Sequence, residues 1–89
     1  MACPKLSNHD FEITVISVVK TYHPGHTVDV DTNFADDLGE EGMTKRKYFA
    51  LIRKDIIDDG CRFDANVTKF DNCETVKDMV AATKKATSC

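Results

Sequence analysis

The sequence has no apolar run near the ~20 residues that a membrane-spanning helix needs, so we expect no membrane span. Its first residues, MACPKLSNHD, lack the apolar centre of a secretory signal, which predicts a cytoplasmic protein. The four cysteines form no CxxC pair, and two of them lie near the ends of the chain. In a cytoplasmic chain this pattern predicts four free thiols, at Cys3, Cys61, Cys73 and Cys89.

Recognisable catalytic motifs are also missing. No Ser-His-Asp or Cys-His order is accompanied by a motif such as a nucleophile elbow. Cys61 has one cationic neighbour, Arg62, which alone does not make a reactive thiol, and we expect a structural cysteine. His23 and His26 flank a Pro-Gly turn with no third ligand nearby, so we expect solvated histidines. The chain is predicted to be no enzyme and to hold no cofactor.

The charge of the chain is mild in total and uneven along its length. A formal net charge of −3 argues against nucleic acid as the main partner. An apolar content of 42% and a charged content of 30% indicate an ordinary globular domain. Acidic residues crowd the segment 29–41, whereas basic residues crowd the segment 45–54. We expect a single domain that is a monomer when free.

Apolar residues at helical spacing predict helices over residues 10–23 and 42–57, with Asp10 as the first N-cap. A short helix is expected over 66–70, and a capping box of Thr75 and Asp78 begins the last helix. Residues 26–42 form a long connection without helical period. The pattern predicts an all-α four-helix bundle of three principal helices and one short helix over residues 10–85, between tails 1–9 and 86–89. Its expected core comprises Phe11, Val15, Phe34, Leu38, Phe49, Ile52, Phe70, Val76 and Val80.

The stretch TNFADDLGEEGM, residues 32–43, resembles the signature of the acyl carrier proteins. In that family a small residue and a buried aromatic residue precede an acidic pair and Leu-Gly, and a long helix follows. The resemblance covers about residues 10–84 and includes the first helix, the long first loop and the last helix. It implies the small four-helix carrier fold.

The sequence departs from this family at its functional centre. In the family, Leu-Gly is followed by two residues and then by the serine that receives 4′-phosphopantetheine, and here Gly42 occupies the position of this serine. Glu41 keeps the acid before it and Met43 keeps the apolar residue after it. Glycine has no side-chain oxygen for a phosphodiester, and Thr44 lies about 200° further round a helix. The resemblance therefore implies a carrier-like fold without a phosphopantetheine arm.

The helix after Gly42 reverses the charge that the resemblance implies. Carrier proteins typically dock onto basic patches of their enzymes through an acidic second helix, whereas this helix carries a run of cations. We expect these cations to face solvent and to bind a protein partner with an acidic surface. The predicted function is a non-enzymatic interaction module, whose predicted partner-binding residues are Met43, Lys45, Arg46, Lys47 and Arg53.

Two alternative functions stay open. The first is an acyl carrier in fatty-acid, lipid or polyketide biosynthesis that is loaded by unorthodox chemistry. The second is a calcium-responsive helical protein. Asp29, Asp31, Asn33 and Glu40 match the oxygen-bearing positions 1, 3, 5 and 12 of an EF-hand loop. Phe34 stands where that loop needs its glycine. We therefore expect no dedicated metal site, and only weak divalent binding by this loop.

Overall fold

The computed structural model describes Cys3 and residues 5–88. Most of this part is helical. The elements run in the order α1 (Asn8–Tyr22), α2 (Phe34–Leu38), the 3₁₀ helix η1 (Gly42–Arg46), α3 (Lys47–Asp58), β1 (Arg62–Phe63), the 3₁₀ helix η2 (Val67–Phe70), α4 (Val76–Ala86) and β2 (Thr87–Ser88). The prediction of an all-α chain is confirmed at this level, apart from a two-stranded sheet. None of the helices in the described ranges has the length and apolar content to cross a membrane.

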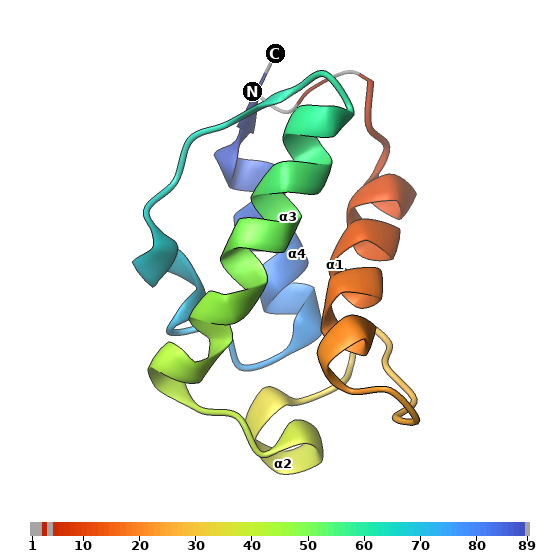
Figure 1. The fold of residues 1–89 in the computed structure, drawn as a ribbon, viewed down its shortest axis with the longest axis vertical. Coiled ribbons are helices and arrows are strands. Elements are labelled where there is room, and N and C mark those ends of the chain that lie inside the picture. The colour runs from red at the N-terminus through yellow and green to blue at the C-terminus, as the bar shows by residue number, and fades with distance from the viewer. Residues whose placement is uncertain (1–2, 4, 89) are drawn as a thin grey trace.

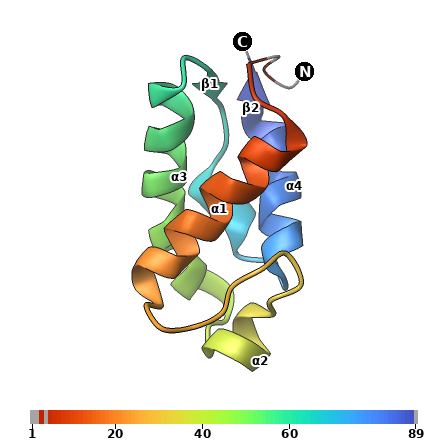
Figure 2. The ribbon, with the colours of Figure 1, turned by 90° about the vertical axis from the view of Figure 1, so that its right-hand side faces the viewer.

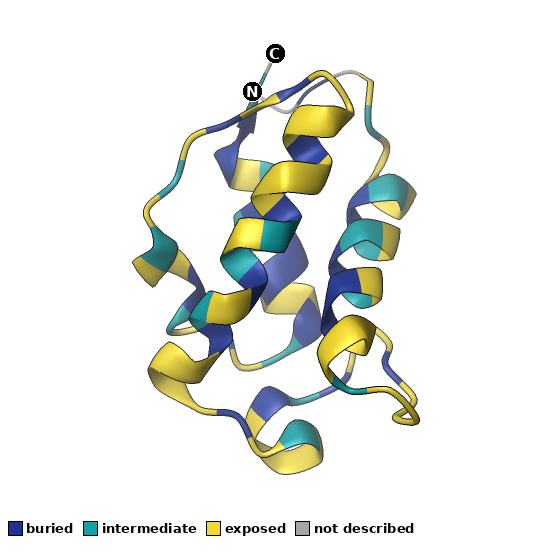
Figure 3. Cartoon of the chain, in the orientation of Figure 1, coloured by how far each residue is buried: buried dark blue, intermediate teal, exposed yellow. Residues whose placement is uncertain are grey.

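The long helices surround one core. Helix α1 packs against both α3 and α4, while α2 lies at the end of the molecule opposite β1 and β2 (Figures 1 and 2). The buried residues of the three long helices belong to one core, and exposed positions cover the outer side of α3 (Figure 3). Of the nine expected core residues, Leu38 and Phe49 are only partly buried against the core, and the other seven are buried.

Local capping explains where the helices begin. Thr75 and Asp78 form the predicted capping box of α4, because each side chain accepts a hydrogen bond from the other residue's backbone N–H. The predicted N-cap of α1 was wrong. Ser7 caps this helix, and Asp10 is the third residue of a second capping box, with its carboxylate accepting from Ser7 N–H. The sequence Ser-Asn-His-Asp offers two caps, and the earlier one adds almost a turn of helix.

The connection 26–42 contains a short helix that the sequence did not indicate. Asn33 caps α2 by accepting a hydrogen bond from Asp36 N–H, and Gly39 ends it with a φ of +67°. Five residues are too few to show a helical period, so the apolar pattern of residues 26–42 predicted a loop throughout. Phe34, the first residue of α2, is fully buried, so the connection packs onto the bundle through this ring.

Both predicted tails contribute to ordered structure at the opposite end. The described part of segment 1–9 holds the first turn of α1 and a disulfide between Cys3 and Cys61. Within segment 86–89, Thr87 and Ser88 form β2, which pairs antiparallel with β1. The expectation of four free thiols was therefore wrong for Cys3 and Cys61, whereas Cys73 is a free, buried thiol. Residues 1, 2, 4 and 89 lie outside the described residues.

Candidate functional site

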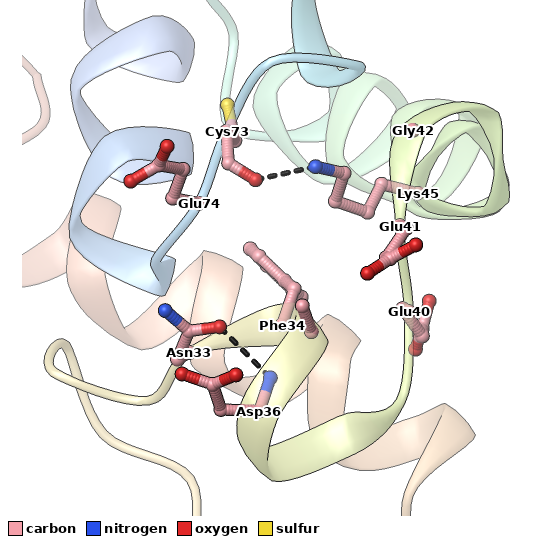
Figure 4. Close-up of a pocket in the computed structure, with 10 residues that line it drawn as sticks. Asn33, Phe34, Asp36, Glu40, Glu41, Gly42, Lys45, Cys73 and Glu74 are labelled. Atoms are coloured by element: carbon pink, nitrogen blue, oxygen red, sulfur yellow. Dashed lines mark hydrogen bonds between the residues drawn. The ribbon is translucent and has the colours of Figure 1, made fainter.

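The end of the molecule around Gly42 holds a groove of about 370 Å³. It lies between α2, the start of η1 and the turn before α4 (Figure 4). Carboxylates from these three separate segments line it, at Asp36, Glu41 and Glu74. The side chains of Glu40 and Glu41 leave opposite sides of the same segment, and that of Glu41 extends toward the groove. The surface beside Gly42 is thus acidic.

Gly42 adopts a backbone conformation that a serine would not share easily. Its φ is +54°, in the left-handed region that L-residues other than glycine rarely adopt. A Cβ atom built on Gly42 would meet nothing within 4 Å, so space does not restrict this position. The glycine is therefore required by the backbone, where it joins the loop to η1, and it exposes no group for covalent attachment.

Lys45 does not face solvent, contrary to the prediction. Its side chain is buried, with 4% of the residue exposed, and its ammonium donates a hydrogen bond to the carbonyl of Cys73 (Figure 4). The ammonium also lies 5.7 Å from the centre of the Phe34 ring, within the range of a cation–π contact. Lys45 therefore ties η1 to the turn before α4 and offers no charge to a partner.

The next two cations are also engaged within the chain. Arg46 donates two hydrogen bonds to Asp71, at 2.9 and 2.7 Å, and this pairing raises the pKa of Arg46. Lys47 lies 3.1 Å from Glu40 Oε2 in an ion pair, rather than in a well-directed hydrogen bond. The Lys47 ammonium also sits over the rings of Tyr22 and Tyr48. The prediction that the run Lys45–Lys47 presents solvated charges is wrong for Lys45, which is buried, whereas Arg46 is partly exposed and Lys47 is exposed.

Three of the five predicted partner-binding residues, Met43, Lys47 and Arg53, are exposed. Met43 has 64% of its surface exposed, and Arg53 is exposed on α3. The structure adds Ile57, which is 42% exposed and is not among the five predicted residues. Met43, Lys47, Ala50, Lys54 and Ile57 follow one another at spacings of four, three, four and three residues. All five are exposed. The spacing places Lys47, Ala50, Lys54 and Ile57 along one side of α3, and Met43 precedes them in η1. We call these five residues the α3 stripe.

A buried polar cluster that the sequence did not predict lies beside the groove. Glu40 is 5% exposed, and its Oε1 accepts a hydrogen bond from the Tyr48 hydroxyl and contacts His23 Nε2. His23 Nε2 is also 2.9 Å from the Tyr48 oxygen. The expectation of a solvated His23 was wrong, since its side chain is 15% exposed. These residues lie 8 to 25 positions apart, so no local pattern joins them.

The four EF-hand-like residues do not converge on one point. Asp29 accepts hydrogen bonds from Asp31 N–H and the Thr32 hydroxyl, and Asn33 caps α2. Glu40 is enclosed by the cluster described above. Within Cys3 and residues 5–88, no three His, Cys, Asp or Glu side chains are grouped so as to hold a metal ion. The calcium alternative gains no support from this geometry.

Cys73 is the cysteine that lines the groove, and its thiol is not activated. Burial raises the pKa of the Cys73 thiol to about 11, and the nearby Lys45 ammonium does not offset this effect. The thiolate is the reactive form of cysteine, so a thiol with this pKa is almost entirely protonated at neutral pH. The groove therefore contains no activated cysteine.

Comparison of the chain with known protein families, with curated proteins and with solved structures finds no match. The resemblance to acyl carrier proteins consequently rests on the residues 32–43 and on the order of elements around them.

Proposed function

We propose that this chain is a non-enzymatic, acyl carrier protein-like docking module that has no phosphopantetheine arm. The order of elements supports a carrier-like architecture, with a long helix, a long loop, a second long helix, a short helix and a last helix. The glycine at the expected serine position supports the loss of the arm, because it lacks an oxygen and has a positive φ. A carrier-like protein without this arm can still bind partner proteins through its surface.

One observation carries the choice of docking surface. Met43 and Ile57 are two of the few large apolar side chains that the described residues leave exposed, and both belong to the α3 stripe. Ala50 lies midway between them, so three apolar positions recur every seven residues. This spacing matches the side of a helix that packs against another helix. We infer that a partner helix covers the α3 stripe.

The charges of the stripe define the partner further. Lys47 and Lys54 occupy the positions between the apolar residues, and Arg53 flanks them. Each of these two lysines has an internal acidic contact, with Glu40 and with Asp58, the latter at 3.6 Å between two highly exposed side chains. The exposed Lys54–Asp58 ion pair contributes little to stability, so Lys54 can readily pair with a carboxylate of a partner instead. An amphipathic helix with apolar residues and intervening Asp or Glu side chains fits this surface.

The test is the capture of partners from the native cell by wild-type protein and by matched variants. Met43→Asp and Ile57→Asp place charges within the stripe, and Ile13→Asp is the control, because Ile13 is 49% exposed on α1. We expect the stripe variants to lose a partner that wild type and Ile13→Asp retain. A partner set that is unchanged in both stripe variants, with the fold verified by circular dichroism, contradicts the proposal.

The intact mass of the recovered protein tests the missing arm. We expect no phosphopantetheine adduct, including after co-expression with a broad-specificity phosphopantetheinyl transferase. An adduct or an acyl group on the wild-type chain would instead support the alternative of a carrier with unorthodox loading.

A further inference from the structure

Glu40 is held by side chains from two other elements. The Tyr48 hydroxyl and the Lys47 ammonium reach it from α3, and His23 reaches it from the C-cap of α1. The carboxylate is buried, so it has exchanged water for these contacts. A buried carboxylate is stable only while such partners are present. Glu40 therefore joins the segment before η1 to both helices.

Counting donors and acceptors fixes where the protons lie. Tyr48 donates to Glu40, and burial together with the Glu40 charge raises the pKa of this phenol, so its proton stays in place. His23 Nε2 contacts the carboxylate and the Tyr48 oxygen, and both of these offer lone pairs to it. An unprotonated His23 Nε2 would place its lone pair against the lone pairs of the Glu40 carboxylate, and the two would repel. The arrangement therefore requires a proton on His23 Nε2.

The Glu40 contacts hold one side of the connection, whereas backbone contacts hold the other. Phe34 N–H donates to Glu74 O, Val76 N–H donates to Thr32 O, and Lys77 N–H donates to Val30 O, which attach residues 30–34 to the start of α4. The segment 39–42 follows α2, where Gly39 N–H and Glu40 N–H donate to the carbonyls of Ala35 and Phe34, and its side-chain anchor on α1 and α3 is Glu40. Loss of the Glu40 side-chain contacts would thus free residues 39–42 from α1 and α3 and leave residues 30–34 attached to α4.

We propose that Glu40, His23 and Tyr48 form a proton-operated latch, which holds residues 39–42 against α1 and α3 while Glu40 is ionised and releases them when Glu40 is protonated. A neutral carboxylic acid loses the attraction of Lys47 and carries a proton that competes with the donors around it. The titratable groups that face the latch are Tyr22, His23 and His26 at the end of α1 and Lys47 and Tyr48 on α3.

The direction of the pH effect follows from Glu40. Burial acts to raise the pKa of this carboxyl, but the contacts from Tyr48, His23 and Lys47 outweigh it and leave the pKa below the ordinary value of 4.5. A lowered pKa means that the ionised form is favoured by the fold. The latch is therefore fully closed above about pH 4.5 and opens as the pH falls through the lower pKa of the folded state.

The experiment follows the Glu40 side-chain carboxyl and the backbone amides of residues 39–42 by NMR from pH 7 to pH 2.5. We expect the amides of 39–42 to shift with the Glu40 carboxyl, while those of residues 30–34 and of α4 keep their folded positions. Glu40→Gln removes the charge with little change of shape, so at pH 7 its 39–42 amides should already resemble those of the acid form. Asp58→Asn, at an exposed acid on α3, is the control and should leave the 39–42 amides unchanged.

Tyr48→Phe keeps the carboxyl and tests the latch independently of Glu40→Gln. Removal of one donor should move the Glu40 midpoint to higher pH, together with the transition of residues 39–42. The proposal is overturned if residues 39–42 change only with global unfolding, if Glu40→Gln matches wild type at pH 7, or if the Tyr48→Phe midpoint does not rise.

Discussion

The guanidinium of Arg46 donates two hydrogen bonds to the carboxylate of Asp71, which lies 25 positions further along the chain. The neighbouring Lys45 reaches the carbonyl of Cys73, only two residues beyond Asp71. These two adjacent cations thus attach η1 to the turn between η2 and α4. A run of charge that resembles a docking surface in the sequence is largely an internal fastening in the fold.

The burial of Lys45 predicts a strong effect of charge reversal there. Lys45→Glu places a carboxylate beside the Cys73 carbonyl, so two acceptors would meet without a donor. We expect a loss of about 3 kcal/mol or more in the free energy of unfolding. Arg53→Glu, at an exposed position on α3, should change the free energy of unfolding by less than about 0.5 kcal/mol. Urea denaturation of the two variants measures the difference, and equal midpoints would show that Lys45 is not buried.

The Arg46–Asp71 pair predicts a pH dependence of stability. The hydrogen bonds from Arg46 lower the pKa of Asp71 below its ordinary value of 3.8. The pair therefore stabilises the fold above about pH 4, and this contribution is lost as the pH falls through the lower pKa of the folded state. Asp71→Asn should show a shallower loss of stability between pH 5 and pH 2 than wild type. Thermal melts across this range give the slope, and parallel curves would remove the pair from the acid response.

Phe34 anchors α2, and its ring is completely buried. Phe34→Ala should lower the free energy of unfolding by about 3–5 kcal/mol, because it removes the buried ring and leaves a cavity. Ile13→Ala, at an apolar side chain on α1 that is 49% exposed, is the control. Denaturant unfolding compares the two variants. A loss below about half a kcal/mol for Phe34→Ala would mean that the connection 26–42 does not pack onto the bundle.

The Cys3–Cys61 disulfide spans 58 residues of sequence. Closing a loop of this length in the unfolded chain is expected to stabilise the fold by about 4 kcal/mol. Reductant should therefore lower the thermal midpoint of the oxidised protein, and Cys3→Ser should melt at the lower temperature with or without reductant. Alkylation of the denatured, unreduced protein should spare this pair. Labelling of both cysteines would contradict the pairing and would suit the cytoplasmic location that the sequence predicts.

The positive φ of Gly42 predicts that a side chain at this position strains the backbone. Gly42→Ser should destabilise the fold by about 1–2 kcal/mol, through the left-handed conformation alone, because the site has open space around it. Ala50→Ser, at an exposed position within α3, is the matched control for adding a hydroxyl. Equal stability of Gly42→Ser and wild type would indicate that the backbone relaxes to a negative φ.

The sequence alone determined the features that depend on near neighbours. The helical period of the apolar residues predicted the long helices, and the Thr75–Asp78 box predicted the start of α4, since a capping box needs only four consecutive residues. The absence of an oxygen at Gly42 also needs no structure. Local signals failed at Ser7, where two caps were available, and in α2, which is too short to show a period, and they overstated the burial of Leu38 and Phe49.

Only the tertiary structure decided which charges are free. Lys45 and Arg53 look alike in the sequence, yet one is buried against Cys73 and the other is exposed. Glu40 reads as one more acid in an acidic loop, until the fold brings His23 and Tyr48 to it. The solvation and partners of a charge depend on contacts between residues far apart in the chain, and these exist only once the helices have packed.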